Sequence, residues 1–309
     1  MDVMTWLLDS DPAIRWQVLR DLMDAPAEAV SAERSRVATS GSGARVLDLQ
    51  GADGQWEGGA YFPEHDDQPG QPWTATAFSL QFLRELGIDP VDSRVQGAVE
   101  RVRENSHWEY DGSRFFDGEV EPCINGLTVG IGAYFGMRVE GIVERLLGEQ
   151  MADGGWNCEA ENGSVRSSFH TTLAVLDGLR EYEDAVDGND AVTVARLRGH
   201  EYLLDRYLMR RLSTGGLINE QWLQFSFPPR WHYDVLSALD YFRASRTSYD
   251  PRMDEALAVV ESKRGTDGRW LLENTHPGSV HLEMEDGDGK PSRWNTLRAL
   301  RVLRSFGRS

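Results

Sequence analysis

Three turns with the pattern Asp-Gly-x-Trp constrain the fold of this 309-residue chain more than any other feature. They begin at Asp53, Asp153 and Asp267, and each follows a stretch whose apolar residues have helical spacing. Glycine permits the sharp turn, and tryptophan brings a large apolar surface that must be buried. A helical stretch that repeatedly closes on such a turn predicts stacked supersecondary units, none of which buries its apolar face alone.

Helices with apolar residues at i, i+3, i+4 and i+7 are predicted after these turns, at 73–83, 169–179 and 294–303. Two more begin at Cys123 and at Trp231. More polar helices are predicted between them, at 91–105, 138–150, 189–210 and 251–263, and an N-terminal pair at 11–23 and 27–50. Helices that are apolar nearly all round must be buried, whereas amphipathic helices can face water. The alternation predicts an inner ring of helices wrapped by an outer ring.

The fold that we expect is therefore all-α, because no stretch of comparable length alternates as a strand does. It is an (α/α) barrel, or toroid, of about five to six antiparallel helix pairs. The repeats span nearly the whole chain, so we expect one domain over residues 1–309.

The charge and composition of the chain disfavour two classes of binding partner. A formal net charge of −18 disfavours nucleic acid and anionic membranes as partners, because phosphate binding needs clustered Lys and Arg. No run of about 18 apolar residues occurs, and the N-terminus lacks the features of a signal peptide. We expect a cytoplasmic protein without a membrane span, and its oligomeric state stays open. Two cysteines make no disulfide framework and leave core packing, metal binding or catalysis as their roles.

The segment from Gln150 to Trp156 resembles the QW-type repeat of squalene and oxidosqualene cyclases. Gln50 to Trp56 is a second copy, and a third has Lys263 in place of glutamine. The stretches 16–22, 226–236 and 291–300 also resemble small bacterial squalene cyclase-like proteins, mostly of unassigned activity. The resemblance implies the (α/α) barrel of the terpenoid cyclase and prenyltransferase superfamily. It does not imply an activity, because one fold hosts unrelated functions.

The acid motif of class II terpene cyclases, Asp-x-Asp-Asp-Thr-Ala, has one weak counterpart. Glu64-His65-Asp66-Asp67 is followed by Gln68-Pro69-Gly70 rather than by Thr-Ala. A metal-free cyclase would use Asp66 or Asp67 as its acid. The alternative is a solvated pair of acidic residues in a turn.

A second resemblance concerns the zinc site of protein prenyltransferase β subunits, which combine Asp-x-Cys at one helix start with His at a later one. Here Glu121-Pro122-Cys123 and His170 begin successive predicted helices, and Cys158 precedes the second. The similarity implies a Zn²⁺ site with Glu121, Cys123 and His170 as ligands. The place of Cys158 in the turn before the second helix adds it as a ligand, with His232 as a spare one, and thiolate, imidazole and carboxylate suit zinc. Alternatively, these residues bind no metal: the cysteines are small buried side chains, the histidine belongs to the first turn of a helix, and the glutamate is favoured there by the helix dipole.

Further site residues are predicted at the starts of the inner helices. His232 and Asp234 are the candidate proton-handling groups. Aromatic side chains at these starts can line an apolar pocket or simply form core, and three arginines can orient a polar head group or cap helices. The predicted substrate-binding residues are Trp73, Arg166, Phe169, Arg230, Trp231, Tyr233, Arg293 and Trp294.

The function that we expect is that of a zinc-dependent enzyme, whose metal activates a thiol or water for attack on a small apolar or terpenoid-like substrate. A transferase, a hydrolase or a cyclase fits this description. A metal-free terpene cyclase-like enzyme and a non-enzymatic protein that binds apolar ligands are the alternatives. Protein prenylation is disfavoured, because it requires a separate α subunit.

Overall fold

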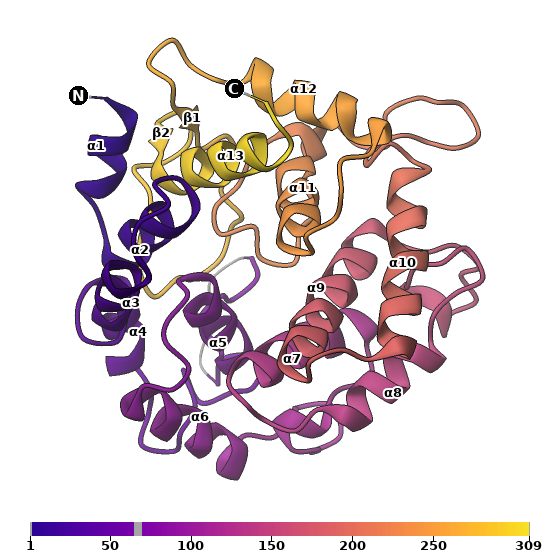
Figure 1. Ribbon diagram of the computed structural model, residues 1–309. Coiled ribbons are helices and arrows are strands. Elements are labelled where there is room, and N and C mark those ends of the chain that lie inside the picture. Colours follow the sequence, from indigo (N-terminus) through magenta and orange to yellow (C-terminus); the bar gives the residue numbers. More distant parts are fainter. Residues whose placement is uncertain (1, 65–69, 309) are drawn as a thin grey trace. The chain divides into compact units, whose positions relative to one another are not determined.

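The computed structural model describes residues 2–64 and 70–308, and these residues are mostly helical (Figure 1). In the described part of the chain the strands are one antiparallel pair of two residues each, β1 (Trp270–Leu271) and β2 (Pro291–Ser292). The all-α class is confirmed. The helices are α1 (Val3–Leu8), α2 (Pro12–Asp21), α3 (Ala27–Ser35), α4 (Gly41–Asp48), α5 (Thr76–Glu85), α6 (Ser93–Asn105), α7 (Pro122–Tyr134), α8 (Glu140–Gly148), α9 (Phe169–Ala185), α10 (Asp190–Leu204), α11 (Val235–Ala244), α12 (Asp254–Ser262) and α13 (Arg293–Ser305).

The main difference from the predicted helices lies near the N-terminus. The stretch 27–50 is not one helix, because a 3-10 turn, Arg36–Ala38, separates α3 from α4. Ser40 is extended, with φ −152° and ψ 159°, and Gly41 has φ +74°, so the backbone cannot continue as a helix there. The short helix α1 was not predicted. It begins where the Asp2 carboxylate accepts a hydrogen bond from the Thr5 amide.

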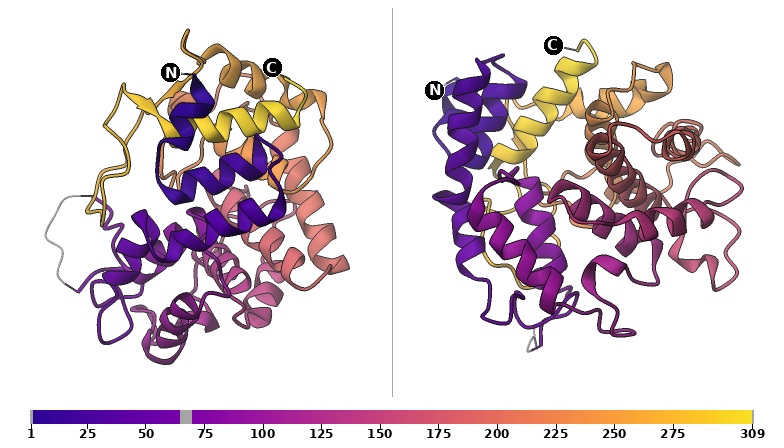
Figure 2. Two further views of the ribbon diagram at one scale, coloured as in Figure 1. Left: turned by 60° about the vertical axis from the view of Figure 1, so that its left-hand side comes forward. Right: turned by 60° about the horizontal axis from the view of Figure 1, so that its bottom comes forward.

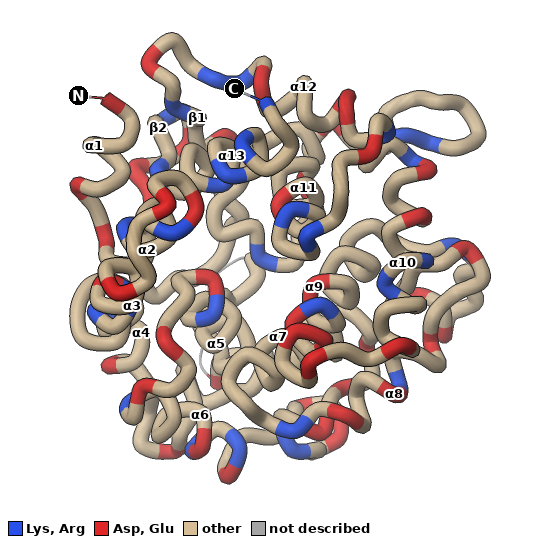
Figure 3. Tube along the Cα trace, viewed as in Figure 1, with Lys and Arg blue, Asp and Glu red and all other residues tan. Residues whose placement is uncertain are grey.

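The chain forms two compact units. One consists of the described residues of Met1–Glu33, Glu201–His276 and Glu283–Ser309, and the other of those of Arg34–His200 and Pro277–Leu282. The single domain over 1–309 and the ring of five to six helix pairs stay predictions. Basic and acidic residues both occur along each unit (Figure 3). Among the described helices none combines the length and the apolar character that crossing a bilayer requires.

The first unit joins the two ends of the chain, since α13 packs against α2 (Figure 2). Arg301 on α13 donates to the Gln17 side chain at 2.8 Å and to the Asp240 carboxylate on α11, also at 2.8 Å. Arg243 donates to the same carboxylate at 2.7 Å. This ionic cluster links three helices, and its charges are compensated by one another rather than by water.

The second unit holds a close parallel pair of helices, α7 and α9. A Cβ added to Gly178 would lie 2.1 Å from the carbonyl oxygen of Gly126, and one added to Gly126 would lie 2.7 Å from the backbone of Val175. Gly130, one turn further along α7, lies against Gly178. Because later residues of α7 meet later residues of α9, the helices run in the same direction. Their N-terminal ends therefore lie on the same side.

The three Asp-Gly-x-Trp turns share one hydrogen-bond pattern, although they belong to different units. Each indole N–H donates to a carbonyl ten residues earlier in the preceding helix, at 2.8 Å for Trp56, 2.7 Å for Trp156 and 2.8 Å for Trp270. Each tryptophan amide donates to a buried threonine hydroxyl in the next α-helix along the chain. The acceptors are Thr76 at 3.1 Å, Thr172 at 3.0 Å and Thr296 at 3.0 Å. Each turn thus ties the end of one helix to the start of another.

Candidate metal centre

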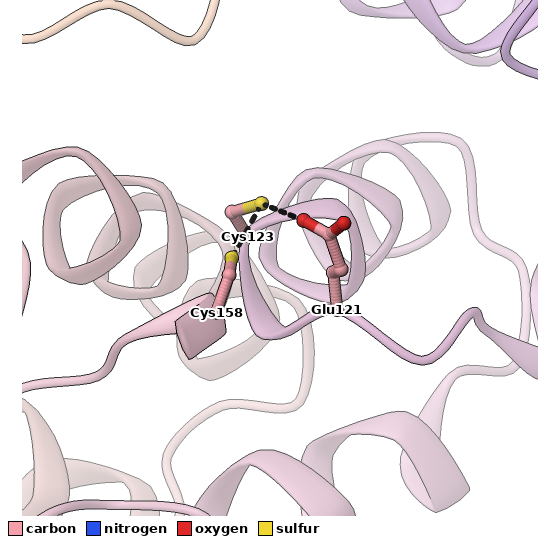
Figure 4. A group of neighbouring side chains, drawn as sticks. All are labelled: Glu121, Cys123 and Cys158. Atoms are coloured by element: carbon pink, nitrogen blue, oxygen red, sulfur yellow. Dashed lines mark hydrogen bonds between the residues drawn. The ribbon is translucent and has the colours of Figure 1, made fainter. Parts of the chain in front are cut away.

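The first turn of α7 presents a carboxylate and a thiol side by side. Glu121 is the N-cap residue, Pro122 begins the helix, and the Cys123 thiol donates to the Glu121 carboxylate at 3.3 Å (Figure 4). Proline suits this position, because its missing N–H would have no partner in the first turn. Asn125 holds the preceding loop, since its side chain pairs with both the N–H and the C=O of Glu119.

The second thiol comes from the loop before α9. Cys158 begins the 3-10 helix Cys158–Ala160, whose N-cap is Asn157. Two bonds close the loop at its base: Ser168 N–H donates to the Trp156 carbonyl at 2.8 Å, and the Asn157 amide donates to the Arg166 carbonyl at 2.7 Å. The loop brings Cys158 to Cys123, with the two Sγ atoms sharing a hydrogen bond at 2.9 Å.

The first turn of α9 contributes a hydroxyl. Thr171 Oγ1 lies 3.5 Å from Cys158 Sγ, and Ser168 caps this helix. Because α7 and α9 are parallel, the positive ends of both helix dipoles lie on the side of the two thiols. Helix N-termini favour the ionised form of nearby cysteines.

The two thiols do not ionise alike. Their mutual hydrogen bond lowers the pKa of Cys158, and the hydrogen bond with Thr171 lowers it as well. The same mutual hydrogen bond raises the pKa of Cys123. Burial and the negative charges of Cys158 and Glu121 act in the same upward direction on Cys123. Once Cys158 is a thiolate, the Cys123 thiol can donate its proton to it. The pair therefore carries one negative charge more readily than two, unless a cation is present.

Glu121, Cys123 and Cys158 form a group that can hold a metal ion. One ligand atom from each lies within 4.8 Å of the others, Glu121 is exposed, and both cysteines are half-buried. Two sulfur ligands of a tetrahedral zinc lie about 3.8 Å apart, given a Zn–S bond of about 2.3 Å. The sulfurs would have to separate by roughly 1 Å from their 2.9 Å contact, which small side-chain rotations permit.

His170, the fourth predicted ligand, is not a member of this group among the described residues. It is the second residue of α9, and Thr171 follows it. Successive residues of an α-helix leave the helix axis about 100° apart, so Thr171 and His170 start in different directions. Sequence reasoning missed Thr171, whose only signal was its place in the first turn beside a predicted ligand.

The predicted proton-handling residues belong to the other unit. Asp234 is buried and acts as the N-cap of α11, accepting from the Ser237 amide at 2.7 Å and hydroxyl at 3.0 Å. Burial raises the pKa of this carboxyl, although Arg298 opposes the shift. The His232 ring stacks between those of Trp231 and His276, with centroid distances of 3.8 Å and 3.7 Å.

Most of the aromatic residues predicted to bind substrate are buried. Trp73, Phe169, Tyr233 and Trp294 are at most 5% exposed, whereas Trp231 is 42% exposed. The Trp73 indole donates to the Pro277 carbonyl at 3.0 Å, and the Tyr233 hydroxyl donates to the Leu208 carbonyl at 2.6 Å. These hydrogen bonds hold Trp73 and Tyr233 in the packed interior.

The three predicted arginines have different surroundings. Arg293 donates to the Trp6 and Asp9 carbonyls at 3.3 Å each and so anchors α1. Arg166 is exposed beside the Cys158 loop. Arg230 adopts a left-handed backbone with φ +57°. Asp66 and Asp67, the acids of the cyclase alternative, lie outside the described residues.

Tyr61 is an aromatic residue that the sequence did not single out, and the candidate metal group influences its ionisation. Burial raises the pKa of Tyr61, and electrostatic interactions with Cys123 and Glu121 act in the same direction. The Tyr61 ring packs on Phe78 at 4.8 Å and on the exposed Phe62 at 5.1 Å. The Glu109 carboxylate holds this turn by accepting from the Tyr61 amide at 2.9 Å.

No protein-family model matches this sequence, and no curated protein matches it. The resemblance to the cyclase and prenyltransferase superfamily stays a prediction.

Proposed function

We propose that this protein is a zinc-dependent enzyme whose metal is held by Glu121, Cys123 and Cys158. One observation carries the proposal: two cysteines that lie 35 residues apart in sequence, the only two in the chain, meet at a carboxylate. Thiolate and carboxylate ligands select zinc over magnesium and calcium. Three protein ligands are typical of catalytic zinc sites, which leave a fourth position open.

A bound zinc ion would lower the pKa of a water molecule or thiol in that open position. The side chains of this chain set the surroundings. Glu121 is exposed, so the group can be reached from solvent, and the Thr171 hydroxyl supports the charge of Cys158. Glu119, whose pKa is raised by burial, adds a second carboxyl beside Glu121.

The same surroundings indicate the class of substrate. Tyr61 and Phe62 offer an aromatic surface, which favours a substrate with an apolar part. Glu119 and Glu121 make the neighbourhood acidic, so a neutral or cationic substrate is favoured over a phosphate or another anion.

Zinc analysis of the reduced protein tests the proposal. We expect one zinc per chain, which C123S and C158S lose and E121Q binds more weakly. E119Q and H170A are the matched controls and keep their zinc. A folded, reduced wild-type protein that binds no zinc, or a C123S variant that binds it equally well, would overturn the proposal.

Cobalt substitution tests the open position. With two thiolate ligands, Co²⁺ gives a thiolate charge-transfer band and the visible absorption of a tetrahedral site. Addition of a small thiol should then shift the visible spectrum, because it enters the fourth position. A spectrum that does not respond to any added ligand would show a closed, structural site.

A further inference from the structure

The two cysteines have a second chemistry besides metal binding. Their Sγ atoms are 2.9 Å apart, both side chains are half-buried rather than sealed in the core, and both thiols are free. A disulfide bond requires about 2.05 Å between the sulfurs, and a shared zinc requires about 3.8 Å. The observed separation lies between these values, so each state is about 1 Å away.

We propose that Cys123 and Cys158 form a reversible two-electron dithiol–disulfide couple, and that only the reduced pair binds the metal. The couple itself needs no metal, whereas its control of metal binding rests on the function proposed above. The oxidant is a small disulfide of the glutathione type.

Cys158 is the attacking sulfur, because it shares a hydrogen bond with Cys123 and the Thr171 hydroxyl, 3.5 Å from its sulfur, can donate to it once its own proton has left. Its sulfur forms a bond with one sulfur of the small disulfide, whose S–S bond breaks, and the other half leaves as a thiolate. The protein then carries a mixed disulfide at Cys158.

Cys123 resolves the mixed disulfide. The Glu121 carboxylate, 3.3 Å from its sulfur, can accept the Cys123 proton. The Cys123 sulfur then bonds to Cys158, the mixed disulfide breaks, and the second small thiolate leaves. Overall the protein loses two electrons and two protons, and one small disulfide is reduced to two thiols. The resolving step is favoured over attack by a second oxidant molecule, because the two protein sulfurs are already in contact.

The disulfide removes both thiolate ligands at once. Glu121 alone cannot retain zinc, since a single exposed carboxylate is a weak site. Conversely, bound zinc protects the thiols, because only the metal-free fraction can react. At zinc concentrations about 100-fold above the dissociation constant, oxidation should slow by about 100-fold.

The experiment titrates the full-length, metal-free, reduced protein with mixtures of reduced and oxidised glutathione. Free thiols, intact mass and peptide maps are measured at each ratio. Since the chain has two cysteines, every lost thiol reports on this pair. We expect both thiols to disappear in one transition, with the loss of two hydrogen atoms per chain and a Cys123–Cys158 linked peptide. C123S and C158S should instead each gain one glutathione.

The couple is overturned if the wild-type protein keeps both thiols, accumulates one or two glutathione adducts, or forms disulfide-linked dimers. Urea unfolding midpoints of the serine variants show whether they fold.

The same titration with zinc-loaded protein tests the control of metal binding: zinc should be released in step with thiol loss. If the oxidised protein retains zinc, the proposal that oxidation controls metal binding is overturned, whereas the dithiol–disulfide couple is not. A reduced protein that binds no zinc overturns the proposed function but leaves the couple intact.

Discussion

The hydroxyl of Thr171 lies 3.5 Å from the sulfur of Cys158, whereas His170, the adjacent residue of α9, is outside the group of side chains that can hold a metal ion. In the metal-free protein, T171V should slow the alkylation of Cys158 by iodoacetamide at neutral pH. The expected factor is about 2- to 10-fold, the equivalent of one hydrogen bond of about 0.5–1.5 kcal/mol.

Peptide mass mapping separates Cys158 from Cys123 in this measurement, and T171S, which keeps the hydroxyl, should react like the wild type. Equal alkylation rates in T171V and the wild type would rule out a role for this hydroxyl in stabilising the thiolate.

The hydrogen bond from the Trp156 amide to the Thr172 hydroxyl should stabilise the folded protein. T172V leaves the buried Trp156 amide without its 3.0 Å acceptor, and an unsatisfied buried donor costs about 1–3 kcal/mol. The free energy of unfolding in urea should fall by this amount. T172S keeps the hydroxyl and should retain most of the stability. A T172V variant as stable as the wild type would contradict a contribution of this hydrogen bond.

The close approach of α7 and α9 predicts a glycine requirement. G178A places a Cβ 2.1 Å from the Gly126 carbonyl oxygen, so the helices must move apart, at a cost of about 1–3 kcal/mol. Gly141 on α8 is the matched control. Nothing lies within 4 Å of a Cβ added there, and G141A should stabilise the protein by about 0.5–1 kcal/mol through helix propensity. Thermal or urea unfolding measures both changes, and a neutral G178A would contradict the close packing.

The ionic cluster around Asp240 should make stability depend on pH. Burial acts to raise the pKa of this carboxyl, but the charges of Arg301 and Arg243 outweigh burial and hold the pKa well below the ordinary value of 3.8. A depressed folded-state pKa contributes stability that is present above about pH 4 and is lost as the pH falls further.

D240N should therefore destabilise the protein at pH 7 by about 3–5 kcal/mol, because it leaves buried arginines without their partner. The difference from the wild type should shrink as the pH falls below about 4. Urea unfolding over this pH range checks it, with E28Q as the control at an exposed glutamate. A D240N effect that is the same at pH 3 and pH 7 would show that the carboxylate charge is not its cause.

The sequence by itself determined the helices and the turns, because their signals are local. Apolar spacing, the Gly-Trp turns and capping residues such as Asp234 act within a few residues of one another, and helices were expected where α5, α7, α9, α11 and α13 lie. The resemblance to the prenyltransferase zinc site, with the position of Cys158 between two predicted helix starts, grouped Glu121, Cys123 and Cys158 with His170, and the first three do lie together. The helix prediction failed for 27–50, where a 3-10 turn at Arg36–Ala38, the extended Ser40 and Gly41 at φ +74° interrupt the helix.

The tertiary structure alone decided which side chain of each helix faces the site. Thr171 and His170 are adjacent in sequence, and the rotation of α9 about its own axis selects between them. That rotation is set by packing along the helix, where Gly178 and Val175 meet Gly126, several residues from the thiols. Likewise Trp73 and Trp294 have the aromatic character of a ligand wall, yet the neighbours that bury them come from distant parts of the chain. Helix rotation and long-range burial depend on contacts that no local pattern contains.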